Sequence, residues 1–334
     1  MVSSLFPGKA PLALPLIGSP MFIVSGPELV IAQCKAGIAG TMPSLSVRPA
    51  EALDGALTRI REALAAHDRE HPERPAAPFG INLISHKTNA RLEHDLEVCI
   101  RHRVPLIITS LGPSRLVVER VHAYGGVVFH DVVNLRHARK AIAEGVDGII
   151  AVAAGAGGHA GTLSPFALVG EIRKVFNGWI ALSGAMSTGA HVAAAIAMGA
   201  DFAYMGTRFI ATAEAQASDD YKAMVLESTA TDIVYSPYFT GVHGNYLRPS
   251  IAKAGFDPDA LPAREADSMD IATRVDKPKA WKDVWSAGQG VGSVDDIPAV
   301  DILVGRLQRE FLQATHRLQA SNVLMGRNHF SQGT

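Results

Sequence analysis

Short apolar runs alternate with longer segments of mixed polarity along the chain as far as residue 212. The runs are almost continuously hydrophobic, which is typical of strands in a sheet whose two faces are both covered. They predict eight strands, at residues 14–22, 38–45, 79–84, 105–112, 126–133, 147–153, 179–184 and 201–207. The intervening segments place apolar residues three and four positions apart, as a helix requires. They predict seven helices, at residues 27–37, 49–71, 90–104, 114–124, 134–145, 164–177 and 187–199.

Polar and small residues mark the ends of these elements. Ser114 and Asn134 are placed to cap the starts of two helices, and Pro165 lies in a first turn, where proline is favoured. Gly37 follows the first helix, and glycine is a usual stop signal there. Doubly wound open sheets show the same alternation, but eight strands in succession favour a closed (β/α)8 TIM barrel. We therefore expect an α/β fold of this barrel type.

The pattern changes after Thr212. Residues 213–284 combine short helical segments with aromatics and prolines, and they predict a small helical insertion after strand eight that serves as a substrate-binding domain or lid. A glycine-rich return follows at residues 285–294, WSAGQGVGSV. We expect the barrel to comprise residues 1–212 and 285–330, with the insertion lying between these two parts.

A closing helix is expected from residue 297 to about residue 324. Its apolar positions recur at helical spacing, which indicates an amphipathic helix. They are Ile302, Leu303, Leu307, Phe311 and Leu312. This helix and the aromatic-rich insertion are candidate surfaces for a homodimer.

The composition is that of an ordinary soluble enzyme with a sizeable core, since 48% of the 334 residues are hydrophobic and 19% are charged. The 31 basic and 32 acidic residues leave a net charge of −1 and form no basic run, so neither nucleic acid nor a membrane surface is an expected partner. No apolar run reaches the roughly 20 residues that span a bilayer, and the proline-broken N-terminus is a poor signal peptide. The two cysteines, Cys34 and Cys99, fit reduced thiols in a cytoplasmic protein.

Three successive strand ends open into loops of small residues, within residues 151–164, 182–189 and 204–212. In a barrel these loops lie at the C-terminal face, where active sites are built. Glycine lets backbone N–H groups approach an anion, and a following helix start adds positive potential. Simple packing of strand against helix would also favour small residues. The residues suited to a phosphate are Ser183, Gly184, Ala185, Gly206 and Thr207.

His159 is the candidate catalytic residue, because Gly157 and Gly158 let the backbone bring its imidazole close to a bound ligand. A histidine titrates near neutrality and can abstract a proton or hold an anion. A loop histidine bonded to a backbone carbonyl is the alternative. His130 and Asp131 at the end of strand five are either polar packing of the barrel or part of the site. These three side chains are too few to favour a metal centre, and no nucleophile elbow or P-loop is present.

Four segments of the chain resemble the nitronate monooxygenase family, whose members were formerly called 2-nitropropane dioxygenases. They are GAGGHAG (155–161), LSGAMSTG (182–189), AMGADFAYMGTRFIAT (197–212) and WSAGQG (285–290). The resemblance runs from SPMFIVSGPELV near the N-terminus to the last helix. Flavin-dependent enoyl-acyl-carrier-protein reductases and NADH:quinone reductases are similar over the same motifs.

The resemblance implies a barrel that binds FMN non-covalently and oxidises alkyl nitronates with O2 to a carbonyl compound and nitrite. It makes His159 the active-site histidine. The residues implied to contact FMN are Met21, Asn82, His130, Gly158, Ser183, Gly184, Ala185, Gly206, Thr207 and Gln289. The alternative that the same motifs leave open is an FMN-dependent NAD(P)H reductase of enoyl or quinone substrates. A flavin-binding protein without turnover is a third reading.

Two positions depart from the pattern of the family. Asp131 stands where relatives often carry a lysine, so the residue either replaces a charge beside the flavin or simply packs. Ala185 stands where the phosphate loop has a glycine, and we expect its φ angle to be negative, because an alanine is otherwise disfavoured there.

Overall fold

The computed structural model describes residues 6, 11–262 and 280–326, with side chains as far as residue 320. The predictions for residues 263–279 of the insertion, and for residues 1–5, 7–10 and 327–330 of the barrel, lie outside this part of the chain. Within it, no helix is both long enough and apolar enough to cross a membrane.

Eight parallel strands form one sheet, in the order β1-β9-β8-β6-β5-β4-β3-β2. The two outer strands meet through a parallel bridge between Ile17 and Ala39, and the N–H of Gly18 donates to the Ala39 carbonyl at 2.8 Å, so the sheet is nearly closed. The predicted barrel is confirmed. The strands are β1 (Leu16–Gly18), β2 (Gly40–Pro43), β3 (Phe79–Ile84), β4 (Leu106–Ser110), β5 (Val127–Val132), β6 (Gly148–Val152), β8 (Trp179–Ser183) and β9 (Phe202–Met205).

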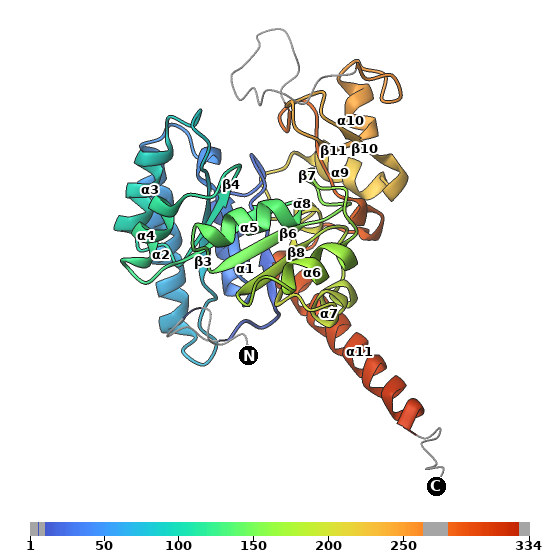
Figure 1. The fold of residues 1–334 in the computed structure, drawn as a ribbon, viewed down its shortest axis with the longest axis horizontal. Helices are drawn as coiled ribbons and strands as arrows, with labels where there is room; N and C mark the ends of the chain where they lie inside the picture. Colours follow the sequence, from blue (N-terminus) through green and yellow to red (C-terminus); the bar gives the residue numbers. More distant parts are fainter. Residues whose placement is uncertain (1–5, 7–10, 263–279, 327–334) are drawn as a thin grey trace.

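Helices connect consecutive strands of the barrel and cover its outside (Figure 1). The predicted caps are confirmed, because the Ser114 side chain accepts the Val117 N–H at 3.4 Å and the Asn134 side chain accepts the His137 N–H at 2.9 Å. The helices are α1 (Pro27–Lys35), α2 (Ala52–Glu70), α3 (Leu92–Arg101), α4 (Arg115–His122), α5 (Leu135–Ala143), α6 (Pro165–Arg173) and α7 (Gly189–Ala197), with a 3-10 turn η2 (Ser44–Ser46) after β2.

The inside of the barrel is filled by side chains. Ile17, Ile108, Phe129, Ile150 and Phe202 are fully buried there and form a cluster that is separate from the larger core between strands and helices. A filled barrel has no pore, so a ligand can bind only above the ends of the strands.

The segment after β9 is not purely helical, as the sequence predicted, but mixed. It contains α8 (Thr207–Ile210), α9 (Asp219–Glu227), η3 (Ala230–Asp232) and α10 (Arg248–Lys253), and also an antiparallel pair formed by β10 (Ile233–Ser236) and β11 (Gly244–Leu247). β11 pairs in turn with β7 (Gly158–His159), which belongs to the loop after β6. Figure 1 shows these elements gathered on one side of the barrel mouth. The short strands escaped prediction because four residues give too little alternation to recognise.

The glycine-rich return segment, residues 285–294, contains η4 (Gln289–Ser293), and α11 (Val300–Gly326) is the last helix. The first part of α11 packs on the barrel through Leu303 and Leu307, which are buried, and its C-terminal part projects away from the other elements (Figure 1). Ile302 and Leu312 were expected on the same apolar face, but they are 56% and 54% exposed. The amphipathic prediction is therefore right for one side of this helix and wrong for the other.

Candidate active site

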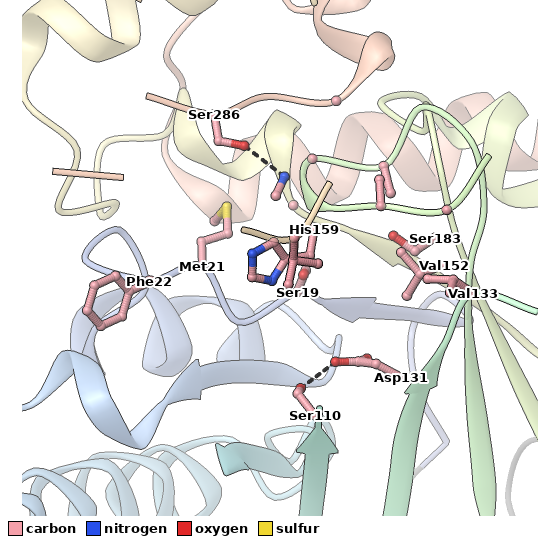
Figure 2. A pocket seen from close by; sticks show the side chains of 18 of the residues that line it. Ser19, Met21, Phe22, Ser110, Asp131, Val133, Val152, His159, Ser183 and Ser286 are labelled. Atoms are coloured by element: carbon pink, nitrogen blue, oxygen red, sulfur yellow. Dashed lines mark hydrogen bonds between the residues drawn. The ribbon is translucent and has the colours of Figure 1, made fainter. Parts of the chain in front are cut away.

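A cavity of about 1200 Å³ lies above the C-terminal ends of the barrel strands and under the insertion. Figure 2 shows part of its lining. The structure brings almost all the predicted site residues to its wall. Those that line it are Met21, Asn82, His130, Gly158, His159, Ser183, Gly184, Ala185, Gly206 and Thr207.

Gln289 does not line the cavity. Its side chain is exposed, and its backbone N–H donates to the Gly155 carbonyl at 2.9 Å. A Cβ atom added to Gly155 would meet the Gln289 Oε1 atom at 2.9 Å. Gln289 therefore supports the glycine loop from outside and leaves the predicted flavin contact without structural support.

His159 is held in the cavity wall by the insertion and by the return segment. It lies in β7, opposite Gly244 of β11, and the next residue, Ala160, donates its N–H to the His243 carbonyl at 3.2 Å. On the other side, the Gly158 N–H donates to the Ser286 hydroxyl at 2.7 Å. Two segments far from it in the sequence thus fix the backbone around this residue, and its ring points into the pocket lined by Met21, Ser183 and Asp131 (Figure 2).

The surroundings of His159 favour one neutral tautomer. Its Nε2 atom lies 3.0 Å from the Thr240 hydroxyl, which donates its only proton to the Val242 carbonyl at 3.0 Å. With the Thr240 proton on the Val242 carbonyl, Nε2 is assigned as the donor to Thr240 and Nδ1 as the unprotonated nitrogen. Burial lowers the pKa of His159 to about 4, so the ring is neutral at physiological pH. The imidazole is thus held in the form in which it can accept a proton.

The loops after β8 and β9 form a cradle of backbone at one end of the cavity. Gly184 has a φ of +146°, and a Cβ atom there would come within 2.8 Å of the Ala154 carbonyl oxygen, so only glycine fits. Gly206 precedes α8, and the Thr207 hydroxyl accepts the Gly288 N–H at 2.8 Å, so its own proton is free to be donated to a ligand. A loop that admits the close approach of a ligand, with this hydroxyl proton beside it, suits a phosphate group.

Ala185 contradicts the expectation of a negative φ angle, because its φ is +51°. Its N–H donates to the Gly155 carbonyl at 3.2 Å, and this bond holds the loop in the left-handed region. The helix that follows begins at Gly189 after the Thr188 cap, two residues later than predicted. Ser187 instead donates its hydroxyl proton to the Gly290 carbonyl at 2.7 Å and ties the loop to the return segment.

Asp131 and Asn82 belong to one hydrogen-bonded chain across three strands. The Asn82 amide donates to the Ser110 hydroxyl at 2.7 Å and to the Ile108 carbonyl at 3.2 Å, and the Ser110 hydroxyl donates to the Oδ2 atom of Asp131 (Figure 2). The Oδ1 atom of Asp131 is buried and has no hydrogen-bond partner among the described residues. Burial raises the pKa of this carboxyl group to about 6.

His130 lies next to Asp131 at the same strand end. It is buried, and its Nδ1 atom lies 2.8 Å from the Thr109 hydroxyl, which itself donates to the Phe129 carbonyl at 3.2 Å. Burial lowers the pKa of His130 to about 4, so this ring is also neutral. It both packs against the barrel and lines the cavity, so either role that the sequence left open is compatible with its position. No group of three or more potential metal ligands occurs in residues 11–262 and 280–326.

The model of the nitronate monooxygenase family matches residues 3–310. The chain belongs to this family. A nitronate monooxygenase from Paraburkholderia phytofirmans is 27% identical to it, over 91% of this chain and 94% of that protein. The resemblance stated from the motifs is confirmed, and membership of the family makes this protein an oxidoreductase.

Two solved structures show the same fold. The nitroalkane oxidase from Streptomyces ansochromogenes superposes with a TM-score of 0.73 at 22% identity, covering 95% of this chain and 99% of that one. FabK from Thermotoga maritima superposes with a TM-score of 0.75 at 22% identity, covering 96% and 98%. At these identities the superpositions establish the barrel, and the chemistry has to be argued from the site.

An aromatic wall that the sequence analysis missed stands beside the histidine on which the family resemblance centres. The Trp281 ring meets the His159 ring edge to face, with centroids 5.1 Å apart, and the Phe22 ring meets Trp281 at 6.3 Å. Arg48 lies over Phe22 at 5.7 Å, at the outer end of this row. Isolated aromatics in loops give no periodic signal, so the sequence could not assemble this wall.

Backbone strain is concentrated around the cavity. Ile23, Leu111 and Trp281 all have φ angles between +66° and +70°, which non-glycine residues rarely adopt. Leu111 and Trp281 line the cavity, as Ala185 does, and Ile23 lies between the lining residues Phe22 and Val24. Strained conformations of this kind cluster at functional sites, where surrounding contacts impose them.

Proposed function

We propose that this protein is an FMN-dependent enzyme that oxidises alkyl nitronates with O2 to carbonyl compounds and nitrite. The observation that carries the proposal is the neutral His159 ring, with Nε2 bound to Thr240 and Nδ1 unprotonated, in the wall of a large cavity beside a backbone cradle for a phosphate. The overall conversion balances when two nitronates and one O2 give two carbonyl compounds and two nitrites.

The residues present fit FMN. The cradle at Gly184 and Gly206, with the Thr207 hydroxyl proton, suits the phosphate. Met21 and Asn82 also line the cavity and are proposed to contact the flavin ring and the ribityl chain. The buried Oδ1 atom of Asp131 needs a hydrogen-bond donor, and FMN carries both N–H and O–H donors. When bound, FMN supplies the electron acceptor that no side chain of the protein can provide.

His159 is proposed to act on the substrate through Nδ1. A neutral nitroalkane would lose its α-proton to this atom, and the nitronate formed would stabilise the imidazolium by its negative charge. Thr240 is a positioning residue, because its bond to Nε2 keeps the accepting nitrogen free. A substrate that arrives as the nitronate needs no base, so the ring would then hold the anion and orient it.

The direct test is an assay of oxygen consumption and nitrite release with the FMN-loaded protein and propyl-2-nitronate. Nitrite should form only when both FMN and O2 are present, at two molecules for each O2 consumed. Oxygen uptake without nitrite would contradict the proposed reaction.

An FMN-dependent NAD(P)H reductase is the second candidate, and the size of the cavity is the observation in its favour. At about 1200 Å³ it exceeds the roughly 300–1,000 Å³ of sites that enclose one drug-sized ligand, so it has room for FMN and a substantial second ligand. NADH would then be the reductant. Anaerobic bleaching of the bound flavin by NADH, with no response to a nitronate, would favour this candidate over the first.

A further inference from the structure

Asp131 is the sole carboxylate among the described residues that line the cavity. It is immobilised from one side, because Asn82 donates to Ser110 and Ser110 donates to the Oδ2 atom of Asp131. Its other oxygen, Oδ1, is buried without a partner in the described part of the chain. Buried polar atoms in native structures are almost always satisfied, so an orphaned carboxylate oxygen in a ligand cavity indicates a donor on the ligand.

Close to Asp131, the neighbouring side chains keep one charge state near neutral pH, whereas the carboxyl group of Asp131 changes its charge. Tyr204 of β9 faces it, and burial together with the charge of Asp131 raises the pKa of that phenol, which stays protonated. His130 of β5 and His159 of β7 are neutral because burial lowers the pKa of each to about 4. Asn82 and Ser110, on β3 and β4, do not titrate.

Arg48 and His243 line the cavity from loops, and helix α5 contributes two further basic residues. Its Lys140 and His137 line the cavity, and burial lowers the pKa of His137. Lys140 has an exposed side chain, so water screens its effect on the buried carboxyl group. The pKa of Asp131 is about 6, so the carboxyl group gains its charge as the pH rises through a range in which His130 and His159 stay neutral.

We propose that Asp131 contacts the cofactor directly: its Oδ1 atom accepts a hydrogen bond from the bound flavin, and its negative charge makes that flavin harder to reduce. The inference rests on the proposed FMN. Charge and hydrogen bonds beside a flavin tune its electronic properties. A carboxylate in a site shielded from water opposes the uptake of electrons, and it ceases to do so once it binds a proton.

The test is the midpoint potential of bound FMN in the wild type and in Asp131→Asn, measured at pH 8 and at pH 5. Asp131→Asn keeps the shape and removes the charge, so its potential should be more positive than that of the wild type at pH 8. The difference should shrink at pH 5, where the wild-type carboxyl group is protonated. Asp301→Asn, which removes the same charge from an exposed position on α11, should match the wild type at both pH values.

Equal potentials for the wild type and Asp131→Asn at pH 8 would overturn the proposal. If nitrite release from propyl-2-nitronate persisted in that case, the proposed reaction would stand and only the role of Asp131 would fail. Failure of the wild type to bind FMN would overturn both.

A second measurement uses the protein without FMN. The carboxyl group of Asp131 binds its proton more tightly in the folded chain than in the unfolded one, so folding stability falls as pH rises from about 4 through 6. Asp131→Asn lacks this loss and should have a higher Tm than the wild type at pH 8, and a similar Tm at pH 4. A Tm at pH 8 that is equal to or below that of the wild type would show that no buried charge is retained at this position, and would overturn the proposal.

Discussion

The imidazole of His159 can accept a proton only while it is neutral, and two features of its surroundings maintain that state. Burial lowers its pKa to about 4, and the Thr240 hydroxyl occupies Nε2 at 3.0 Å. The sequence identified His159 from the two glycines before it. Thr240 follows 81 residues later, in a loop without a recognisable motif, so its role could not be predicted.

His159→Asn should retain FMN, because the cradle at Gly184 and Gly206 is untouched. Loss of a general base costs about 10²–10⁴-fold, and we expect a fall in this range in kcat/KM for a neutral nitroalkane. The preformed nitronate needs no base and should lose much less. In the wild type, protonation of His159 should cause no loss of kcat/KM for the neutral substrate between pH 8 and pH 5, since the pKa of His159 is about 4. An equal loss on both substrates would remove His159 from the role of base.

Ala185→Gly should stabilise the protein, because Ala185 has a φ of +51° that glycine adopts without strain. The expected gain is roughly 0.5–1 kcal/mol, or on the order of 1–3 °C in Tm. Ala195→Gly is the matched control: it lies inside α7 and should destabilise the protein by about 1 kcal/mol. A lower Tm for Ala185→Gly would show that the left-handed conformation costs nothing here.

At the scale of elements, the active-site loop depends on strands that the sequence did not reveal. Residues 158 and 159 form β7 only because β11 of the insertion lies beside them. Ser286 of the return segment joins β7 to β11, because its hydroxyl accepts the Gly158 N–H and donates to the Asn245 carbonyl. Helix boundaries were more predictable, since the caps at Ser114 and Asn134 are local interactions that need no distant partner.

Ser286→Ala should lower both stability and turnover. The change leaves the Gly158 N–H and the Asn245 carbonyl without their partner, which costs about 1–3 kcal/mol. A looser loop should also reduce kcat on the order of tenfold through misplacement of His159. Ser164→Ala is the control, because Ser164 is exposed and makes no capping bond to α6. If Ser286→Ala lowered Tm and left kcat unchanged, the Ser286 hydrogen bond would stabilise the fold without being needed to position His159.

For the whole molecule, the barrel could be predicted from the sequence because strand and helix signals alternate locally along it. The wall of the active site could not, because it forms where the insertion and the return segment meet the barrel. Arg208 illustrates such a long-range link: it is 2% exposed after β9, and it pairs with Asp296, 88 residues later and just before α11. Arg306 of α11 binds the same carboxylate at 2.6 Å.

Asp296→Asn should destabilise the fold by roughly 1–3 kcal/mol. This value lies between those of exposed and buried ion pairs, because Arg208 is buried while Asp296 is 38% exposed. The bonds from Arg306 and Arg208 lower the pKa of Asp296. Its contribution is therefore complete above about pH 4 and is lost as the pH falls further.

Urea unfolding at pH 7 and pH 3 measures this contribution. The difference in the free energy of unfolding between the wild type and Asp296→Asn should be smaller at pH 3 than at pH 7. Asp259→Asn, in an exposed pair with Arg248, should have little effect at either pH. A difference that is the same at both pH values would mean that the charge of Asp296 does not hold α11 to the barrel.

The proposed function requires that the cavity hold a flavin that responds to nitronates. An anaerobic absorbance titration of the purified, FMN-loaded protein tests it most directly, with propyl-2-nitronate added to one sample and NADH to another. We predict that the flavin band changes with the nitronate and stays unchanged with NADH. Bleaching by NADH alone would contradict the account and indicate a reductase, and the absence of any bound flavin after incubation with FMN would remove the cofactor on which the account rests.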